Sequence, residues 1–448
     1  MINCPGMAAR TVELLAIGAG PSNLALAVAL EELPGPLARR SLLVEKEDAV
    51  AWQRGMLMPW ALSQVSFLKD LVLFRNPRSR FTFLNYLHSV GRLIDFVNLA
   101  AWLPYRMEIS NYLRWVALSL EKVQVEYGKA CLGIEPERDP DGTLTGWLTR
   151  FSEGSTVRSS FLVIGVGRDA CVPPVFHQLP ADRVVHSTRY LQRIPEIAAA
   201  GGAVRVVVVG GAQSSAEMLA AVLEDLPECQ PTVVMRSIGF SLYQTSKFTN
   251  ELYYPSFVDE FFNARPAAQE QMLHEMQLTN YNGLAPDMLE NLYRRIYLER
   301  LTGRQRIRIR TMTDVTEARM EGQDVVLTLH DRKTESVSEL ACDLVLLGTG
   351  FERQMPRLVR ELASTLGLER IQVTRNYRLL TEPSAQAACY LQGVNEATHG
   401  VADSLLSVVG VRSAEILQDV LDFRKERADV PERTEVVGLT SALEGVNA

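Results

Sequence analysis

The 448-residue sequence lacks paired metal or redox ligands: its six cysteines form no Cys-x-x-Cys pair, and its six histidines form no His-x-x-x-His pair. These absences argue against a zinc site and a redox dithiol, and scattered cysteines are typical of proteins kept reduced. The sequence also lacks a long basic block, and its net charge is −7. Nucleic acid and anionic membranes are therefore not expected as partners.

Long apolar runs are missing as well. The run from Leu14 to Leu30 is broken by two glycines, a proline and an asparagine, and the N-terminus has no charged-then-apolar secretory pattern. We therefore expect a cytoplasmic protein without a membrane span or a metal. The composition is that of an ordinary globular protein, 47% hydrophobic and 22% charged, and the length suggests two or three domains.

A strand, a glycine turn and a helix are predicted in TVELLAIGAGPSNLALAVALEEL, with the strand at about 11–17 and the helix ending near Leu33. Such a turn lets the backbone approach a pyrophosphate and points the helix N-terminus at it. The next strand, SLLVEKE, ends near Glu45, which can accept hydrogen bonds from ribose hydroxyls. FAD fits this pattern, although an asparagine replaces the third glycine of the usual fingerprint, and a purely structural turn is the alternative. The expected cofactor contacts in the turn are Gly18, Gly20, Pro21, Ser22 and Asn23.

The same pattern recurs in GGAVRVVVVGGAQSSAEMLAAVLEDL. The strand after it, PTVVMRSIGF, carries Arg236 where the first unit carries Glu45, and an arginine suits the 2′-phosphate of NADPH. Ala212 stands where a second glycine is common, so its methyl group can hold a pyrophosphate slightly away. The expected contacts with NADPH in this turn are Gly210, Gln213, Ser214 and Ser215.

Two further apolar strands end in glycine turns, in SSFLVIGVGRDACVPP (159–174) and CDLVLLGTGF (342–351). In flavoproteins with two dinucleotides, such turns mark where the chain leaves and re-enters the flavin domain; two ordinary buried strands are the alternative. The predicted fold class is α/β, with two Rossmann-like domains for FAD and NADPH and a small helical substrate-binding region. We assign 1–167 and 341–425 to the FAD domain, 180–247 and 301–340 to the NADPH domain, 248–300 to the helical region and 426–448 to a loose polar tail.

Disulfide reductases share this layout but need a paired dithiol, which leaves oxygen as the remaining common electron acceptor. Six stretches carry a resemblance to a known family: GAGPSNLALA, QVSFLKDLVLFRNPRSRFTFLNYL, VVGGAQSSAE, SKFTNELYYP, TNYNGLAPD and ATHGVADSLLSVVGVRS. Through them, over about residues 11–425, the sequence resembles the N-hydroxylating flavoprotein monooxygenases. It is most similar to the L-ornithine N-monooxygenases of hydroxamate siderophore and related peptide biosynthesis.

The resemblance implies FAD and NADPH as cofactors, and L-ornithine and molecular oxygen as substrates. It further implies hydroxylation of the N(5) amine via a hydroperoxyflavin, and a homo-oligomeric state. Two alternatives remain open. One is a relative that acts on L-lysine N(6) or on a diamine, and the other is a non-catalytic flavin-binding redox sensor or scaffold.

The resemblance also implies roles for individual residues. Lys69, in SQVSFLKDLVLFRNP, would bind the ornithine carboxylate with help from Asn250, and Ser407 would touch the substrate. Asn280 would contact the side-chain amine, and Tyr281 would lie beside the nicotinamide half of NADP. The predicted catalytic residues are Asn280, Lys69 and Gln64.

The residues implied for substrate and NADP also have simpler explanations. Lys69 can snorkel to the surface or pair with Asp70, both asparagines can be helix caps or turn residues, and Tyr281 can be a core aromatic. Asp403 and Ser404 can cap the helix predicted after them. The expected flavin contacts are Glu45, Lys46, Trp52, Gln53, Gln64, Ser404, Leu405 and Leu406, with Gln53 in place of the histidine found in many members.

Overall fold

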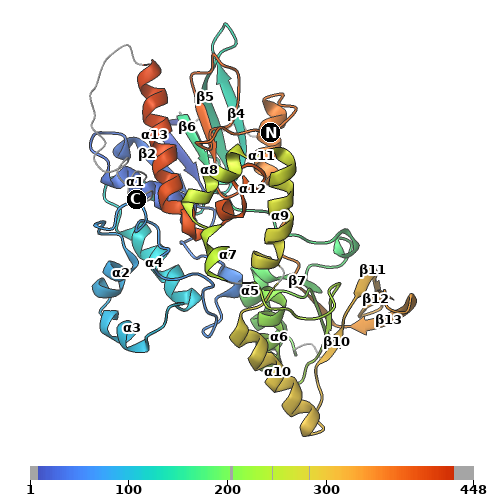
Figure 1. Cartoon of the computed structure of the whole chain (residues 1–448). Helices are drawn as coiled ribbons and strands as arrows, with labels where there is room; N and C mark the ends of the chain where they lie inside the picture. The colour runs from blue at the N-terminus through green and yellow to red at the C-terminus, as the bar shows by residue number, and fades with distance from the viewer. Residues whose placement is uncertain (1–8, 202–204, 245, 282, 428–448) are drawn as a thin grey trace.

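The computed structural model describes residues 9–201, 205–244, 246–281 and 283–427. Its strands form a mixed seven-stranded sheet, a parallel five-stranded sheet and an antiparallel three-stranded sheet. Figure 1 shows the seven-stranded sheet in the upper part of the molecule and the five-stranded sheet in the lower part. The predicted α/β class with two Rossmann-like units is confirmed.

The first sheet is built around β1 (Arg10–Ile17), which pairs in parallel with β2 (Ser41–Val44) and β6 (Thr156–Ile164). Its apolar residues are buried on both faces, as in other parallel sheets. The remaining strands are β3 (Gln124–Glu126) and β15 (Ala388–Leu391), which are parallel, and the hairpin β4 (Cys131–Arg138) and β5 (Leu144–Phe151). The helices α1 (Pro21–Glu32), α4 (Arg106–Leu118) and α13 (Val409–Arg427) share one core with this sheet.

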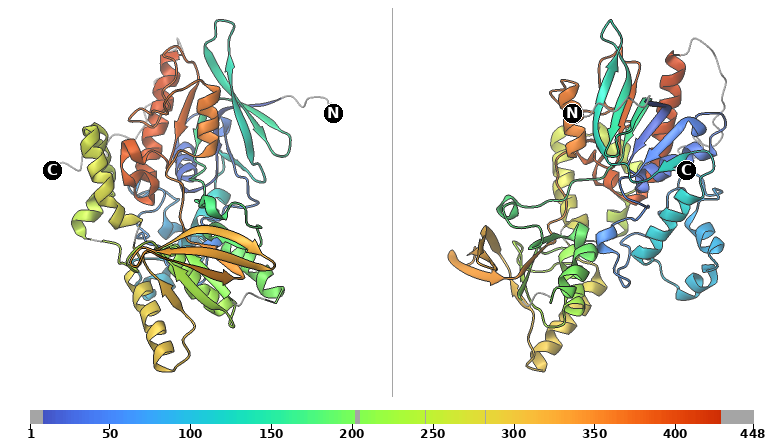
Figure 2. Two further views of the ribbon diagram at one scale, coloured as in Figure 1. Left: turned by 90° about the vertical axis from the view of Figure 1, so that its right-hand side faces the viewer. Right: turned by 180° about the vertical axis from the view of Figure 1, so that it is seen from behind.

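The second sheet has the order β10-β9-β8-β14-β7. Helices α5, α6 and α10 cover one face, and the three-stranded sheet β11–β13 covers the other. In the right-hand view of Figure 2 the three-stranded sheet stands out from the lower part of the molecule, and in the left-hand view it lies in front of that part. The bounds are β7 (Val184–His186), α5 (Tyr190–Ala199), β8 (Arg205–Val209), α6 (Gln213–Asp225), β9 (Gln230–Val234), α10 (Pro286–Leu301), β10 (Arg308–Arg310), β11 (Thr313–Glu321), β12 (Asp324–Asp331), β13 (Ser336–Cys342) and β14 (Leu344–Leu347).

One strand lies in a different sheet from the one expected. The sequence assigned 341–425 to the FAD domain, but β14 pairs with β7 and β8 in the second sheet. A short run of buried aliphatic residues fits any parallel sheet, so the sequence could not tell which sheet it joins. The chain returns to the first sheet only at β15. The other domain boundaries stay a prediction.

Short helices lie in two places: some are beside the first sheet, and others are between the two large sheets. In Figure 1, α8 and α9 lie beside the first sheet, and α7 lies between the upper and lower parts of the molecule. Their bounds are α2 (Phe83–Ser89), α3 (Leu93–Leu99), α7 (Lys247–Glu251), α8 (Pro255–Asn263), α9 (Pro266–Asn280), α11 (Arg357–Thr365) and α12 (Glu396–His399), with 3-10 turns at Arg54–Met56, Val401–Ser404 and Leu406–Val408. Among the described residues, no helix is long and apolar enough to cross a membrane, and no group of three acidic, histidine or cysteine side chains could hold a metal. The tail was expected from 426 onwards, but α13 continues to Arg427, and 428–448 are outside the described residues.

Candidate active site

The first glycine turn leaves room for an anion at the start of α1. Gly18 has φ +91°, and a Cβ there would come within 2.7 Å of the Gly165 carbonyl oxygen, so only glycine fits. A Cβ on Gly20 would meet nothing within 4 Å, and the N-terminus of α1 has no side-chain cap. Its first N–H groups are therefore available to a pyrophosphate, with Pro21 as the first helical residue.

Glu45 stands directly after β2 and is held beside this turn. One carboxylate oxygen accepts the Ala19 N–H at 2.9 Å, and the other accepts the Glu47 N–H at 3.1 Å. Each carboxylate oxygen has a second lone pair, so Glu45 can still accept hydrogen bonds from ribose hydroxyls. The geometry fits the adenosine half of FAD.

Asn23 is fully buried and serves the turn itself. Its Nδ2 donates to the carbonyls of Ile17 and Gly18 at 2.9 and 2.8 Å, and its Oδ1 accepts from Gln392 Nε2 at 2.9 Å. Asn23 was expected to contact the cofactor, and this stays a prediction. The structure leaves only the Asn23 backbone for that, because its amide is enclosed between β1 and the end of β15.

Gln392 links the Asn23 amide to a buried ion pair between Arg412 and Asp403 in the C-terminal segment. Arg412 is 1% exposed; its guanidinium donates to Gln392 Oε1 at 3.2 Å, to Ser22 Oγ at 2.6 Å and to Asp403 Oδ1 at 2.6 Å. Asp403 also accepts the Asn395 N–H at 2.7 Å. Asp403 is therefore no cap of α13, which begins only at Val409. The network ties the pyrophosphate turn to the segment expected to line the flavin.

Sequence reasoning missed Arg412 and Gln392. A signal for Arg412 was present, because an arginine inside the apolar stretch LLSVVGVRSAEIL needs a partner when it is buried. Gln392 carried no such signal, since it follows an ordinary buried strand.

The loop after Glu45 contains one strained residue. Gln53 has φ +54° and ψ +43°, a left-handed conformation that is uncommon for a residue other than glycine. Next to it, the Trp52 N–H donates to Ser110 Oγ at 3.1 Å, which fixes the loop to α4. Lys46, Gln53 and Gln64 are exposed, as a contact with a bound flavin requires.

The second glycine turn approaches β14 closely. Gly210 has φ +133°, and a Cβ there would come within 2.5 Å of the Gly348 carbonyl oxygen. Ser215 was expected to contact NADPH, but it is fully buried and its hydroxyl accepts the Ala212 N–H at 3.1 Å. Its side chain caps α6 and leaves only its backbone for the cofactor, whereas Ser214 remains half-exposed.

Gln213 connects the second turn to a buried ion pair. Its side chain donates to Glu217 at 2.9 Å and accepts the Ala285 N–H at 2.9 Å, so it is engaged within the protein on both sides. Glu217 accepts two parallel hydrogen bonds from Arg106 on α4, at 2.8 and 2.7 Å, and both side chains are buried. Arg106 also donates to the Met56 carbonyl at 2.7 Å. The pair joins the region of the first sheet to the second sheet.

Arg236 lies two residues beyond β9 and is exposed. No acidic side chain among the described residues forms an ion pair with it. An exposed guanidinium beside the second glycine turn suits the 2′-phosphate of NADPH.

The structure removes one of the simpler explanations for Lys69. Asp70 is not its partner, because the Asp70 carboxylate accepts the N–H groups of Val72, Leu73 and Phe83 at 2.7–2.9 Å. The Lys69 ammonium is half-buried and lies 4.8 Å from the centre of the Tyr254 ring. No carboxylate in the described part of the chain pairs with it, and burial lowers the pKa of the ammonium below its usual value.

Asn250 and Ser407, the other expected substrate contacts with described side chains, come from two other segments. Asn250 is half-buried in the last turn of α7, whose cap is Ser246, so the cap explanation for Asn250 does not hold. Ser407 is 2% exposed, and its Oγ is buried without a hydrogen-bond partner among the described residues. An unpartnered buried hydroxyl fits a ligand that completes the site.

Tyr281 is not a core aromatic, since it is 40% exposed. Its hydroxyl donates to Glu396 and lies 3.2 Å from Ser404 Oγ, while Glu396 pairs with Arg168 at 3.2 Å. Desolvation, and then the Glu396 carboxylate, raise the pKa of the Tyr281 phenol above its usual value. Leu405 and Leu406, which follow Ser404, are half-buried. Asn280 ends α9, and its side chain lies outside the described part of the structure.

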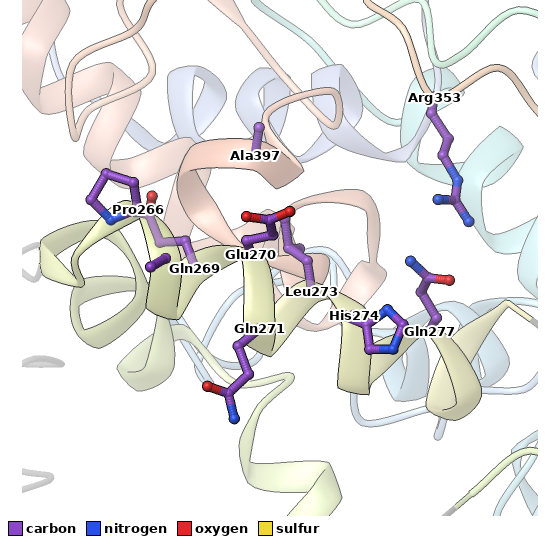
Figure 3. Close-up of a pocket in the computed structure, with 10 residues that line it drawn as sticks. Pro266, Gln269, Glu270, Gln271, Leu273, His274, Gln277, Arg353 and Ala397 are labelled. Carbon is purple, nitrogen blue, oxygen red and sulfur yellow. The ribbon is translucent and has the colours of Figure 1, made fainter.

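An open groove of about 750 Å³ runs along α9, beside Ala397 and Arg353. In Figure 3 the side chains of Gln277 and Arg353 point towards one another across it. None of the expected substrate contacts with a described side chain lines this groove, so we take Lys69, Asn250 and Ser407 as the candidate substrate site. The groove is lined by Pro266, Ala267, Gln269, Glu270, Gln271, Leu273, His274, Gln277, Arg353 and Ala397.

Comparison with known proteins gives matches over nearly the whole chain. The L-ornithine N(5)-monooxygenase of Pseudomonas aeruginosa is 36% identical over 412 residues, which cover 90% of this chain and 92% of that protein. The structure of the ornithine hydroxylase PvdA from P. aeruginosa matches with a TM-score of 0.85 and 34% identity, over 92% of this chain and 100% of that one. The Kutzneria sp. 744 ornithine N-hydroxylase KtzI, solved as FADred-NADP+-L-orn, matches with a TM-score of 0.85 and 32% identity, over 93% and 100%. The family model described as L-lysine 6-monooxygenase/L-ornithine 5-monooxygenase matches residues 10–353, and the chain belongs to this family.

Proposed function

We propose that the chain is an FAD- and NADPH-dependent L-ornithine N(5)-monooxygenase, which hydroxylates the side-chain amine with molecular oxygen by way of a hydroperoxyflavin. The observation that carries the proposal is Lys69, a half-buried ammonium without a carboxylate partner in the described part of the chain. The names of the relatives at 32–36% identity support ornithine as the substrate.

Lys69 selects a substrate that carries a carboxylate. A charge pair at about 4 Å is worth about 4 kcal/mol at an effective dielectric constant near 20, before desolvation is subtracted. A diamine would leave the ammonium unpaired. The pair also fixes the distance from the carboxylate to the reacting nitrogen, which is how ornithine would be distinguished from lysine.

The reacting amine must be neutral to act as a nucleophile. An alkyl amine has a pKa of about 10.4, so deprotonating it near pH 7 costs about 4–5 kcal/mol. A desolvated pocket lowers this cost, and an asparagine can orient the amine without adding a negative charge that would hold the proton. Asn280 is proposed for this role and Asn250 for support of the carboxylate.

The cofactor sites follow from the two glycine turns. Gly18, Gly20 and Glu45 would hold FAD, with Gln53 and Gln64 near the flavin; Ser214 and Arg236 would hold NADPH. When bound, FAD supplies hydride acceptance from NADPH and oxygen activation. The protein positions the amine and excludes water, since Ser407 is buried and Leu405 and Leu406 are half-buried.

The test is NADPH oxidation with ornithine, lysine and putrescine, measured with and without oxygen, together with the hydroxylamine product. Ornithine should give hydroxylated product in proportion to NADPH, and only in the presence of oxygen. Product from lysine or putrescine in preference to ornithine would identify the related hydroxylases. NADPH oxidation without hydroxylated product from any of the three would reject an N-hydroxylase.

A further inference from the structure

The Lys69 ammonium lies over the face of the Tyr254 ring, 4.8 Å from its centre. Lys69 belongs to the irregular loop between Leu62 and Phe83, and Tyr254 is the residue before α8. The contact therefore joins the loop next to the first sheet to the helical region. The contact links Lys69 to the segment that carries Asn250, so it joins two parts of the proposed substrate site.

The position of the Tyr254 ring is set from both sides. Its N–H donates to the Glu251 carbonyl at 3.2 Å, so the turn between α7 and α8 fixes the backbone only four residues after Asn250. The ring also packs against Phe74, with centroids 5.8 Å apart and planes at 60°. Phe74 belongs to the same loop as Lys69, so the loop holds Tyr254 with two side chains.

An aromatic face suits this place better than a carboxylate does. A ring attracts a cation through its quadrupole and carries no net charge. A carboxylate at position 254 would neutralise Lys69 and compete with the substrate. A ring leaves the full positive charge and the remaining N–H groups of Lys69 available, and it compensates part of the hydration that the half-buried ammonium has lost.

We propose that Tyr254 is a positioning residue for substrate binding: its ring holds the Lys69 ammonium in the geometry that receives the ornithine carboxylate. The proposal rests on the proposed function, because it requires a substrate carboxylate at Lys69. Tyr254 acts through Lys69 and takes no part in the reactions of the flavin. A substrate without a carboxylate gains nothing from it.

The test compares Tyr254→Leu, which removes the ring, with Tyr254→Phe, which keeps it. Tyr254→Leu should raise the KM for ornithine about tenfold, which corresponds to about 1.4 kcal/mol, within the range of a partly desolvated cation–π contact. Turnover at saturating ornithine and NADPH oxidation without substrate should stay within about twofold of the parent. Tyr254→Phe should restore the parent KM. The KM for putrescine, if it is turned over, should not change.

Tyr293→Leu is the matched control, because Tyr293 lies on α10 of the same helical region and is 63% exposed. Flavin content and the thermal unfolding midpoint show whether a variant is folded. If Tyr254→Leu does not fold, Tyr254→Met replaces it, because its longer apolar side chain can still pack against Phe74. An unchanged ornithine KM in a folded Tyr254→Leu or Tyr254→Met, beside a raised KM in Lys69→Ala, overturns the inference and leaves the proposed function intact. Equal losses in Tyr254→Leu and Tyr254→Phe also overturn it, because they assign the effect to the hydroxyl. If the parent protein makes no hydroxyornithine, this result rejects the proposed function itself.

Discussion

Replacing Lys69 by alanine removes the cation on which the proposed substrate site depends. The structure sets the size of the effect. The ammonium has no carboxylate partner in the described chain and lies half-buried over Tyr254, so a bound carboxylate would be its principal charged neighbour. Removing one member of a buried pair costs about 3–5 kcal/mol. Because Lys69 is only half-buried, we expect the lower end, about 3 kcal/mol, which is about a hundredfold loss of ornithine affinity.

The assay separates binding from the reactions of the cofactors. NADPH oxidation, peroxide and hydroxylamine product are each titrated with ornithine in Lys69→Ala and in Lys247→Ala, an exposed lysine of α7 that serves as control. Lys69→Ala should reduce its flavin with NADPH as the parent does, release peroxide and form little hydroxyornithine. Hydroxylation of ornithine by Lys69→Ala with a near-normal KM would refute the reasoning and move the substrate site elsewhere.

Three further predictions concern Arg236, Glu217 and the protonation of Lys69. Arg236→Ala should raise the KM for NADPH far more than the KM for NADH, and equal changes would reject the phosphate assignment. Glu217→Gln leaves the buried Arg106 charge unpaired, so its thermal unfolding midpoint should fall by several degrees, whereas Glu224→Gln on the exposed face of the same helix should not change it. The pKa of Lys69 is lowered by burial, and only the protonated form pairs with a carboxylate. Pentanoate inhibition should therefore weaken as the pH rises through a value below the ordinary lysine pKa of 10.5, and Lys69→Arg should remove this dependence.

The two strand–turn–helix units could be predicted from the sequence because their signals are local. The turns require Gly18 and Gly210 at positive φ, and Glu45, directly after β2, and Arg236, two residues after β9, stand at similar distances along the chain from these glycines. The sequence does not show to which side a turn residue points. Asn23 and Ser215 were therefore expected at the cofactors, although both side chains are enclosed and hold the turns.

Long-range pairing was the other limit. β14 is a buried aliphatic strand like β6, and only the three-dimensional arrangement shows that it joins the second sheet. The hydrogen bond from Gln392 to Asn23 joins residues 369 positions apart, and no sequence pattern near either residue predicts it. The sequence indicates such a network only indirectly: a charged residue within an apolar stretch needs a polar partner when it is buried, but the sequence does not show which residue that partner is.

Two cations in apolar stretches show how that need is resolved in two ways. Arg412 is 1% exposed, and its guanidinium is surrounded by Gln392, Ser22 and Asp403. Its pairing is complete without a ligand, so its charge is structural. Lys69 also lies in an apolar stretch, yet the neighbouring Asp70 is occupied by backbone N–H groups, and among the described residues an aromatic face is the partner of the ammonium. From the sequence the two residues raise the same question, and the structure separates them by what is left for a ligand to neutralise. A cation that folding leaves half-buried and unpaired in the described chain is a place where binding can supply the missing charge, and this is why we propose Lys69, and not Arg412, as the residue that binds the substrate.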